Sequence, residues 1–256
     1  MNQKIKNALI SVSDKSELNS ILKVLKKYKI KIISSGGTYT SIKKLGYDCT
    51  EISKYTGFKE MLDGRVKTLH PKIHAGILHD RYNRKHQGEM HQQKFPSIDL
   101  IIVNFYPFQK IVTETRNSKK IIENIDIGGP TMVRSAAKNF NNVTIITNKN
   151  DYGNLINEIQ KNKGCTSLNF RELMSSKAFG LTAYYDAMIA NWFNKKLNIE
   201  FPERKTIFGK KLKKLRYGEN PHQASSVYVS DYNDQNVGFE QLAGKELSYN
   251  NYNDIF

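Results

Sequence analysis

The chain has 256 residues, of which 39% are hydrophobic and 25% charged, so it can build a packed core and is not a disordered protein. Its 40 Lys and Arg residues outnumber its 24 Asp and Glu residues, but the lysines are scattered without an arginine-rich arm, which favours small phosphorylated substrates over nucleic acid. The sequence contains no bilayer-spanning apolar run and no signal peptide, and its two cysteines are too few for a disulfide framework, so we expect a cytoplasmic protein without a membrane partner.

Short apolar runs alternate with amphipathic stretches through the first half of the chain. Between the first two runs, apolar residues from Leu18 to Leu25 recur at helical spacing. This rhythm predicts an α/β fold with a doubly wound parallel sheet, which binds ligands in the loops at its strand ends. The predicted strands, rich in Ile and Val, are residues 7–13, 31–34, 99–106 and 142–148.

After residue 148 the pattern becomes helical, with helices predicted at 150–161 and 169–196 and a basic linker at 209–216. The tail after this region is too short to fold as a domain, so we expect it to be mobile, or ordered only by packing on the first domain or on a second subunit. Its apolar side chains, including Phe201, Phe208, Leu212, Leu215, Tyr217, Val227, Tyr228, Val229, Phe239 and Leu242, are expected to lack packing partners. The predicted domains are a core at 1–148, a helical extension at 149–196 and an incomplete second domain at 197–256.

Two polar loops follow the first two predicted strands: SVSDK (11–15) and SSGGT (34–38). In the second loop, Gly36 and Gly37 allow backbone N–H groups to approach a ligand, and Ser35 and Thr38 offer hydroxyls. The following helix terminus adds partial positive charge, which suits a phosphate. A strand-to-helix turn needs glycine in any case. Neither GxxxxGK[ST] nor GxGxxG occurs, so an ATP-type loop and a dinucleotide fingerprint are unsupported.

Residues 63–80, DGRVKTLHPKIHAGILHD, combine two cations with three histidines. Arg65 and Lys67 are suited to gripping a phosphate or stabilising a developing oxyanion. The spacing of His70, His74 and His79 fits neither HExxH nor a zinc finger, so we expect structural histidines and no metal site.

NFYPF (104–108) and IDIGGPTMVRSAAKN (125–139) form the last polar cluster. Asp126 precedes a Gly-Gly-Pro turn, and Pro130 suits the first position of a helix. Lys138 lies about two turns further along that helix. A lysine there is usually solvated, so a functional role for it depends on its neighbours.

These motifs occur in the order and spacing of a known family. Together with TAYYDAMIANWF, they resemble the amino-terminal part of the bifunctional AICAR transformylase/IMP cyclohydrolase family, and RYGENPHQ and GKELSYNN resemble the start of its transformylase half. The resemblance covers nearly the whole chain. It implies a methylglyoxal-synthase-like fold and dehydrative ring closure of the formylated carboxamide ribotide FAICAR to IMP in purine biosynthesis. It also implies no metal or cofactor for this step, and a homodimer.

The resemblance carries over site residues motif by motif. The implied catalytic residues are Lys67, Tyr106, Asp126 and Lys138. The implied substrate-binding residues are Ser13, Asp14, Lys15, Ser35, Gly36, Gly37, Thr38, Arg65, Val66, Thr68, Asn104, Ile127, Gly128 and Gly129. The chemistry suits these types, because Asp126 can accept the carboxamide proton while Lys67, Tyr106 and Lys138 donate to the formyl oxygen.

Arg216 and Tyr217 match residues that contact AICAR in the transformylase half, whose co-substrate is formyl-tetrahydrofolate. The chain stops before the lysine–histidine pair of that half. We therefore expect this polypeptide to lack formyl transfer.

Three other functions are compatible with parts of the sequence. A methylglyoxal synthase shares the phosphate-binding fold but leaves NFYPF, TAYYDAMIANWF and RYGENPHQ unexplained. A regulatory nucleotide-binding domain is disfavoured because all four implied catalytic residues are retained. A basic nucleic-acid-binding protein is supported by net charge alone.

Overall fold

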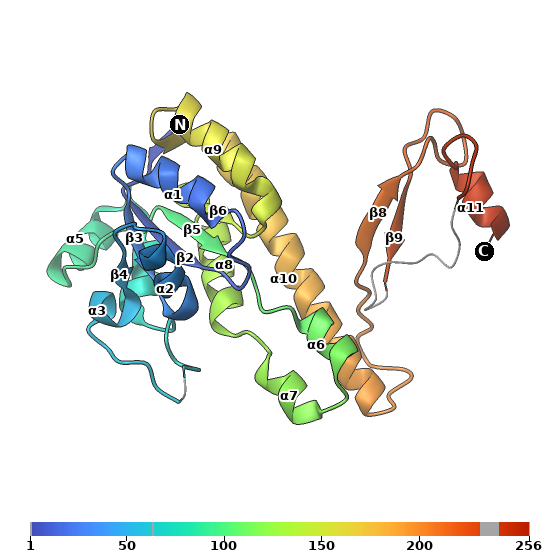
Figure 1. The fold of residues 1–256 in the computed structure, drawn as a ribbon, viewed down its shortest axis with the longest axis horizontal. Coiled ribbons are helices and arrows are strands. Elements are labelled where there is room, and N and C mark those ends of the chain that lie inside the picture. The colour runs from blue at the N-terminus through green and yellow to red at the C-terminus, as the bar shows by residue number, and fades with distance from the viewer. Residues whose placement is uncertain (1, 63, 231–240, 256) are drawn as a thin grey trace. The chain divides into compact units, whose positions relative to one another are not determined.

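The computed structural model describes residues 2–62, 64–230 and 241–255. These residues form two compact units, the first made of Met1–Pro107 and Asn124–Thr182, the second of Phe108–Glu123 and Ala183–Phe256. One long helix, α10 (Leu168–Lys196), contributes its first half to unit 1 and its second half to unit 2 (Figure 1).

A five-stranded parallel sheet forms the centre of unit 1 (Figure 1). Its strands are β2 (Asn7–Ser11), β3 (Lys31–Ser34), β4 (Thr50–Glu51), β5 (Leu100–Val103) and β6 (Thr144–Ile146), in the order β4-β3-β2-β5-β6. Every residue of β5 and β6 is buried, as the Ile- and Val-rich sequences predict. The predicted doubly wound α/β fold is confirmed. The strand order reverses between β2 and β5, the place where such sheets bind ligands.

Amphipathic helices cover this sheet. Helix α1 turns an apolar face inward and ends in Lys26 and Lys27, which suit the negative helix terminus. It packs on α9, whereas α4 packs on α8, which contacts β5 and β6. The helices of unit 1 are α1 (Leu18–Lys27), α2 (Gly36–Lys44), α3 (Ile52–Thr56), α4 (Pro71–Leu78), α5 (Arg84–Gln92), α8 (Gly128–Lys138), the 3-10 turn η1 (Lys149–Asp151) and α9 (Tyr152–Lys161). Two short strands, β1 (Gln3–Lys4) and β7 (Cys165–Thr166), pair antiparallel beside them.

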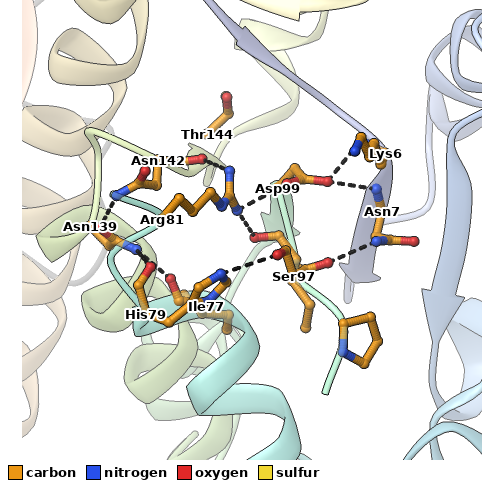
Figure 2. Close-up of polar contacts among 12 residues, drawn as sticks. Lys6, Asn7, Ile77, His79, Arg81, Ser97, Asp99, Asn139, Asn142 and Thr144 are labelled. Atoms are coloured by element: carbon orange, nitrogen blue, oxygen red, sulfur yellow. Dashed lines mark hydrogen bonds and ion pairs between the residues drawn. The ribbon is translucent and has the colours of Figure 1, made fainter. Parts of the chain in front are cut away.

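A buried ion pair fixes the amino-terminal edge of the parallel sheet (Figure 2). Arg81 Nη2 lies 2.9 Å from Asp99 Oδ1, and Asp99 Oδ2 accepts hydrogen bonds from the backbone N–H groups of Lys6 and Asn7 at 2.7 and 2.8 Å. Arg81 also donates to the carbonyl oxygens of Ile98 and Asn142. The starts of β2, β5 and β6 are therefore joined through one guanidinium and one carboxylate.

Unit 2 contains more regular structure than predicted. Its elements are α6 (Phe108–Glu114), α7 (Ser118–Glu123), the end of α10, β8 (Lys210–Lys214), β9 (Ser226–Val229) and α11 (Tyr249–Ile255). Strands β8 and β9 form an antiparallel hairpin, so the prediction of a linker at 209–216 is wrong (Figure 1). The sequence KKLKK of β8 carries little local strand signal, and the strand forms because it pairs with β9.

The apolar side chains of the tail divide into two groups. Phe208, Leu215 and Val229 are buried, and the Phe208 ring meets the edge of Tyr184, so the expectation that they lack packing partners is wrong. Phe201 and Leu242 are 87% and 89% exposed, as expected. Phe239 lies outside the described residues.

Two further points concern the whole chain. Among the described residues, no helix is both long enough and apolar enough to cross a membrane. The two compact units meet after residues 107, 123 and 182, whereas the domain boundaries expected from the sequence lie after residues 148 and 196. The expected division into functional domains stays a prediction.

Candidate active site

The site is built at the carboxyl-terminal edge of the parallel sheet, entirely within unit 1. Asn104 follows β5 and accepts, through Oδ1, hydrogen bonds from the backbone N–H and the hydroxyl of Ser13, at 2.6 and 2.7 Å. Ser13 follows β2, so this contact joins the two strands between which the sheet order reverses. The same contact explains why β2 ends earlier than predicted: Ser13 bonds a side chain instead of a neighbouring strand.

Thr38 has a structural role that the sequence did not indicate. Its hydroxyl accepts a hydrogen bond from the Val12 N–H at 3.0 Å and donates to the Val12 carbonyl at 2.9 Å. The side chain is buried. The Thr38 hydroxyl therefore holds the end of β2 in this structure, and its contact with a ligand stays a prediction.

An ion pair between Asp14 and Lys149 joins the loop after β2 to the loop after β6, at the carboxyl-terminal edge of the sheet. Lys149 follows β6, and its Nζ lies 2.9 Å from Asp14 Oδ2 and 3.1 Å from the Ser16 hydroxyl. Hydrogen bonds from Ser16 and Lys149 hold the pKa of the Asp14 carboxyl well below its usual range. Asp14 is thus a carboxylate that already has a cationic partner.

The amino terminus of α2 forms an anion-binding corner. Gly36 has φ +51°, a conformation that favours glycine, and a side-chain carbon added there would lie 3.3 Å from Lys67 Nζ. A carbon added at Gly37 would lie 3.5 Å from Lys15 Cε and 3.7 Å from its Nζ. Two ammonium groups thus approach a helix end that already carries partial positive charge, and such a corner favours a phosphate. Ser35, the buried N-cap residue, makes no side-chain cap hydrogen bond.

The residue after Lys67 contacts a second helix terminus. A carbon added at Gly128, the first residue of α8, would lie only 2.5 Å from Thr68 Oγ1. Lys67 and Thr68 are consecutive, so their Cα atoms are about 3.8 Å apart. The amino termini of α2 and α8 therefore both lie close to one dipeptide.

Asp126 caps the start of α8. Its Oδ1 accepts a hydrogen bond from the Gly129 N–H at 2.8 Å, and a carbon added at Gly129 would overlap the Asp126 carboxylate. Burial raises the pKa of Asp126, while backbone hydrogen bonds from Gly129 and Tyr106 lower it in part. The carboxylate is thus fixed beside Tyr106, whose side chain is 55% exposed, and next to Ile127, which is 58% exposed.

Lys138 lies at the far end of the helix that begins beside Asp126, and its catalytic role stays a prediction. It is exposed in the last turn of α8, ten residues after Gly128. At 1.5 Å rise per residue, the two helix ends are about 15 Å apart.

Arg65 and Val66 lie in a turn that precedes Lys67. Met61 and Val66 form an antiparallel bridge that closes this turn, with N–H to carbonyl distances of 3.1 and 3.2 Å. Lys67 Nζ lies 2.5 Å from Glu60 Oε2. Asp63, the first residue of the predicted motif, lies outside the described residues.

The three histidines of the motif have structural contacts. His70 caps α4 by accepting from the Lys72 N–H, His74 Nδ1 lies 3.2 Å from the Ser135 hydroxyl, and His79 lies between the Ala75 carbonyl and the Ser97 hydroxyl. Burial lowers the pKa of His74 and of His79. Within the described part of the chain, no three His, Cys, Asp or Glu side chains are grouped so that they could hold a metal ion.

Arg216 and Tyr217 lie in unit 2, between β8 and β9. The Arg216 guanidinium stacks on the Tyr217 ring at 4.7 Å and donates to its hydroxyl at 3.0 Å. Hydrogen bonds from Arg216 and Ser248 lower the pKa of Tyr217.

Sequence reasoning missed Glu60 and Lys149. Lys149 had a usable signal, because it comes directly after the last strand of a parallel sheet. Glu60 had none, since its contact with Lys67 depends on how the intervening turn closes.

Comparison with known proteins agrees with this geometry. The family described as "MGS-like domain" matches residues 17–131, and the family described as "AICARFT/IMPCHase bienzyme" matches residues 136–256. Proteins named "Bifunctional purine biosynthesis protein PurH" from Bradyrhizobium diazoefficiens and Persephonella marina are 45% and 48% identical to this chain over 98% of its length. The chain spans about half the length of these relatives, 48% and 49% respectively.

A solved structure is also similar. The structure described as "Crystal structure of ForH" superposes with a TM-score of 0.66 and is 30% identical in sequence. The match covers 74% of this chain and 99% of that one.

Proposed function

Because this chain belongs to the AICARFT/IMPCHase bienzyme family and carries its MGS-like domain, we propose that unit 1 is an IMP cyclohydrolase that closes FAICAR to IMP. The observation that carries the proposal is the position of Lys67 and Thr68, which contact the first glycines of α2 and α8. One dipeptide thereby links an anion-binding corner to the half-buried carboxylate of Asp126.

The nucleotide 5′-phosphate is proposed to bind at the amino terminus of α2. Backbone N–H groups of Gly36 and Gly37 and the ammonium of Lys15 supply positive charge there. Arg65 lies in the turn that precedes Lys67. Ser13 and Asn104, which follow β2 and β5, are proposed to contact the ribose or the base.

Ring closure needs a base for a weakly nucleophilic amide and a donor for the oxygen that leaves. The carboxamide nitrogen forms a bond to the formyl carbon and gives a proton to the Asp126 carboxylate. The formyl oxygen gains negative charge and takes a proton from Lys67 or from the Tyr106 hydroxyl. The resulting hydroxyl takes the proton back from Asp126 and leaves as water, while the former formamide nitrogen gives its proton to the deprotonated donor. The C=N bond formed in this way completes the ring, and the carboxamide nitrogen keeps its second hydrogen.

The environment of Asp126 supports its role as the base. Burial disfavours the ionised form and so raises the affinity of the carboxylate for a proton. Hydrogen bonds from the backbone of Gly129 and Tyr106 keep the group in one orientation. A base with a raised pKa takes up a proton near neutral pH more readily than an ordinary aspartate.

For the longer protein represented by the relatives, we propose formyl transfer from formyl-tetrahydrofolate to AICAR as the second activity. Arg216 and Tyr217 are the residues of this chain that would contact AICAR there. A homodimer and a cytoplasmic location belong to the same proposal.

The test is incubation of the purified chain with FAICAR while IMP formation is followed by absorbance. Turnover supports the cyclohydrolase, and the 5′-phosphate site predicts that IMP binds far more tightly than inosine in calorimetry. A chain that binds IMP but never forms it from FAICAR would instead be a regulatory nucleotide-binding domain.

A further inference from the structure

The ammonium of Lys67 is held by a carboxylate outside the nucleotide-binding motifs. Glu60 Oε2 lies 2.5 Å from Lys67 Nζ, and the Lys67 side chain is 22% exposed. The two residues flank the bridge between Met61 and Val66, at the next pair of opposed positions. Residues at opposed positions of an antiparallel pair bring their side chains together, so the turn itself directs Glu60 toward Lys67.

The position of Lys67 needs a compensating negative charge. An ammonium beside Gly36 lies at the positive end of α2, and Lys15 approaches the same terminus at Gly37. Like charges at short range repel each other, most strongly where water is partly excluded. Glu60 supplies the opposite charge in the protein without ligand.

We propose that Glu60 is a positioning residue that acts as a built-in substitute for the substrate anion. Its carboxylate holds Lys67 at the terminus of α2 while the site is empty and releases Lys67 when a nucleotide binds. The proposal rests on the proposed function in taking the 5′-phosphate of IMP, bound at the terminus of α2, as the anion that replaces Glu60 beside Lys67. The Tyr106 hydroxyl is then the donor to the formyl oxygen. Glu60 therefore sets nucleotide affinity by competing for Lys67, without touching the reacting atoms.

The inference is tested with Glu60→Gln in the full chain. Removing the competing charge should lower the apparent Kd for IMP about three- to tenfold, because a larger fraction of the protein then has Lys67 available. KM for FAICAR should fall with it, while kcat stays within about twofold, since the reacting groups are unchanged. Glu60→Asp keeps the charge on a shorter side chain and should give an intermediate Kd.

The matched control is Glu89→Gln, which changes net charge equally but lies exposed on α5. It should leave the Kd for IMP unchanged. IMP binding by Glu60→Gln that equals or falls below that of the parent, in a protein with a native circular dichroism spectrum, would overturn the role of Glu60. If the parent also turns over FAICAR, the proposed function stands without this role.

A further outcome distinguishes the role of Glu60 from the cyclohydrolase activity. Tighter IMP binding by Glu60→Gln without any ring closure by the parent would support Glu60 and reject the cyclohydrolase. Failure of both proteins to bind IMP would reject both.

Discussion

Asn104 Oδ1 accepts hydrogen bonds from both the backbone N–H and the hydroxyl of Ser13, at 2.6 and 2.7 Å. One amide oxygen thus joins the loops that follow the paired strands β2 and β5. Replacing Asn104 by Ala leaves the part-buried Ser13 groups without this acceptor. We expect the free energy of unfolding to fall by about 1–3 kcal/mol, and IMP binding to weaken because the loop after β2 loses its anchor.

Chemical denaturation and calorimetry check this prediction. Asn150→Ala is the matched control, because Asn150 lies exposed in η1. Wild-type stability and affinity in Asn104→Ala would show that the contact does not organise the site.

Gly129 is predicted to be irreplaceable for the position of Asp126. A methyl group at Gly129 would overlap the carboxylate of Asp126, so Gly129→Ala must displace the proposed base. A displacement of about 1 Å can cost on the order of a hundredfold in rate. Single-turnover kinetics with FAICAR measure the loss.

The control for this substitution is Gly153→Ala in α9, where an added carbon meets nothing within 4 Å. Helix propensity then predicts a gain in stability of about 0.5–1 kcal/mol and unchanged turnover. If Gly129→Ala and Gly153→Ala turned over FAICAR equally well, the position of Asp126 would not matter to the reaction.

The raised pKa of Asp126 predicts an acid limb in the pH dependence. The base must be ionised to accept a proton, so kcat/KM should fall as the pH decreases through an apparent pKa above the ordinary value of 3.8. Stability depends on pH in the opposite direction to the rate. The raised pKa of Asp126 contributes to the free energy of unfolding in full below pH 3.8, and this contribution is lost as the pH rises through the pKa of the folded state.

A pH–rate profile of the parent and of Asp126→Asn tests this assignment. The residual rate of the variant should lack the acid limb, and its stability should fall less than that of the parent as the pH rises through the raised pKa. An acid limb that survives unchanged in Asp126→Asn would belong to another group.

Much of the fold follows from local sequence. Strand β3 runs from Lys31 to Ser34, as the KIIS pattern predicts. Strand β2 ends earlier than its apolar run, because the Thr38 hydroxyl and the Asn104 amide bind the backbone of Val12 and Ser13. These hydrogen bonds come from residues 26 and 91 positions further along the chain, so a local sequence pattern cannot predict them.

Some features of the site are also visible in the local sequence, whereas others depend on the tertiary structure. The glycines of α2 and α8 stand out in the sequence, and the structure shows that Lys67 and Thr68 approach two of them closely. The distance of Lys138 from Asp126 depends on the length and direction of α8. The strand at 210–214 depends on pairing with β9, a contact that a lysine-rich run does not encode.

The buried pair of Arg81 and Asp99 predicts a large loss of stability when one partner is removed. Asp99→Asn leaves the guanidinium without its counter-charge at the start of three strands. We expect the free energy of unfolding to fall by about 3–5 kcal/mol.

Urea denaturation measures this loss. Asp48→Asn, which removes the surface ion pair with Lys43, should leave the unfolding midpoint almost unchanged. Equal small effects of the two substitutions would show that the network of Figure 2 does not hold the edge of the sheet.

The central claim is that the carboxyl-terminal edge of the sheet converts FAICAR to IMP with Lys67 and Asp126. The most direct measurement is the rate of IMP formation by the purified chain, by Lys67→Ala and by Asp126→Ala, each checked for native circular dichroism. We predict turnover by the parent and a loss on the order of a hundredfold or more in each folded variant. Absence of ring closure by the parent, or a variant that retains activity within about threefold, would contradict this account.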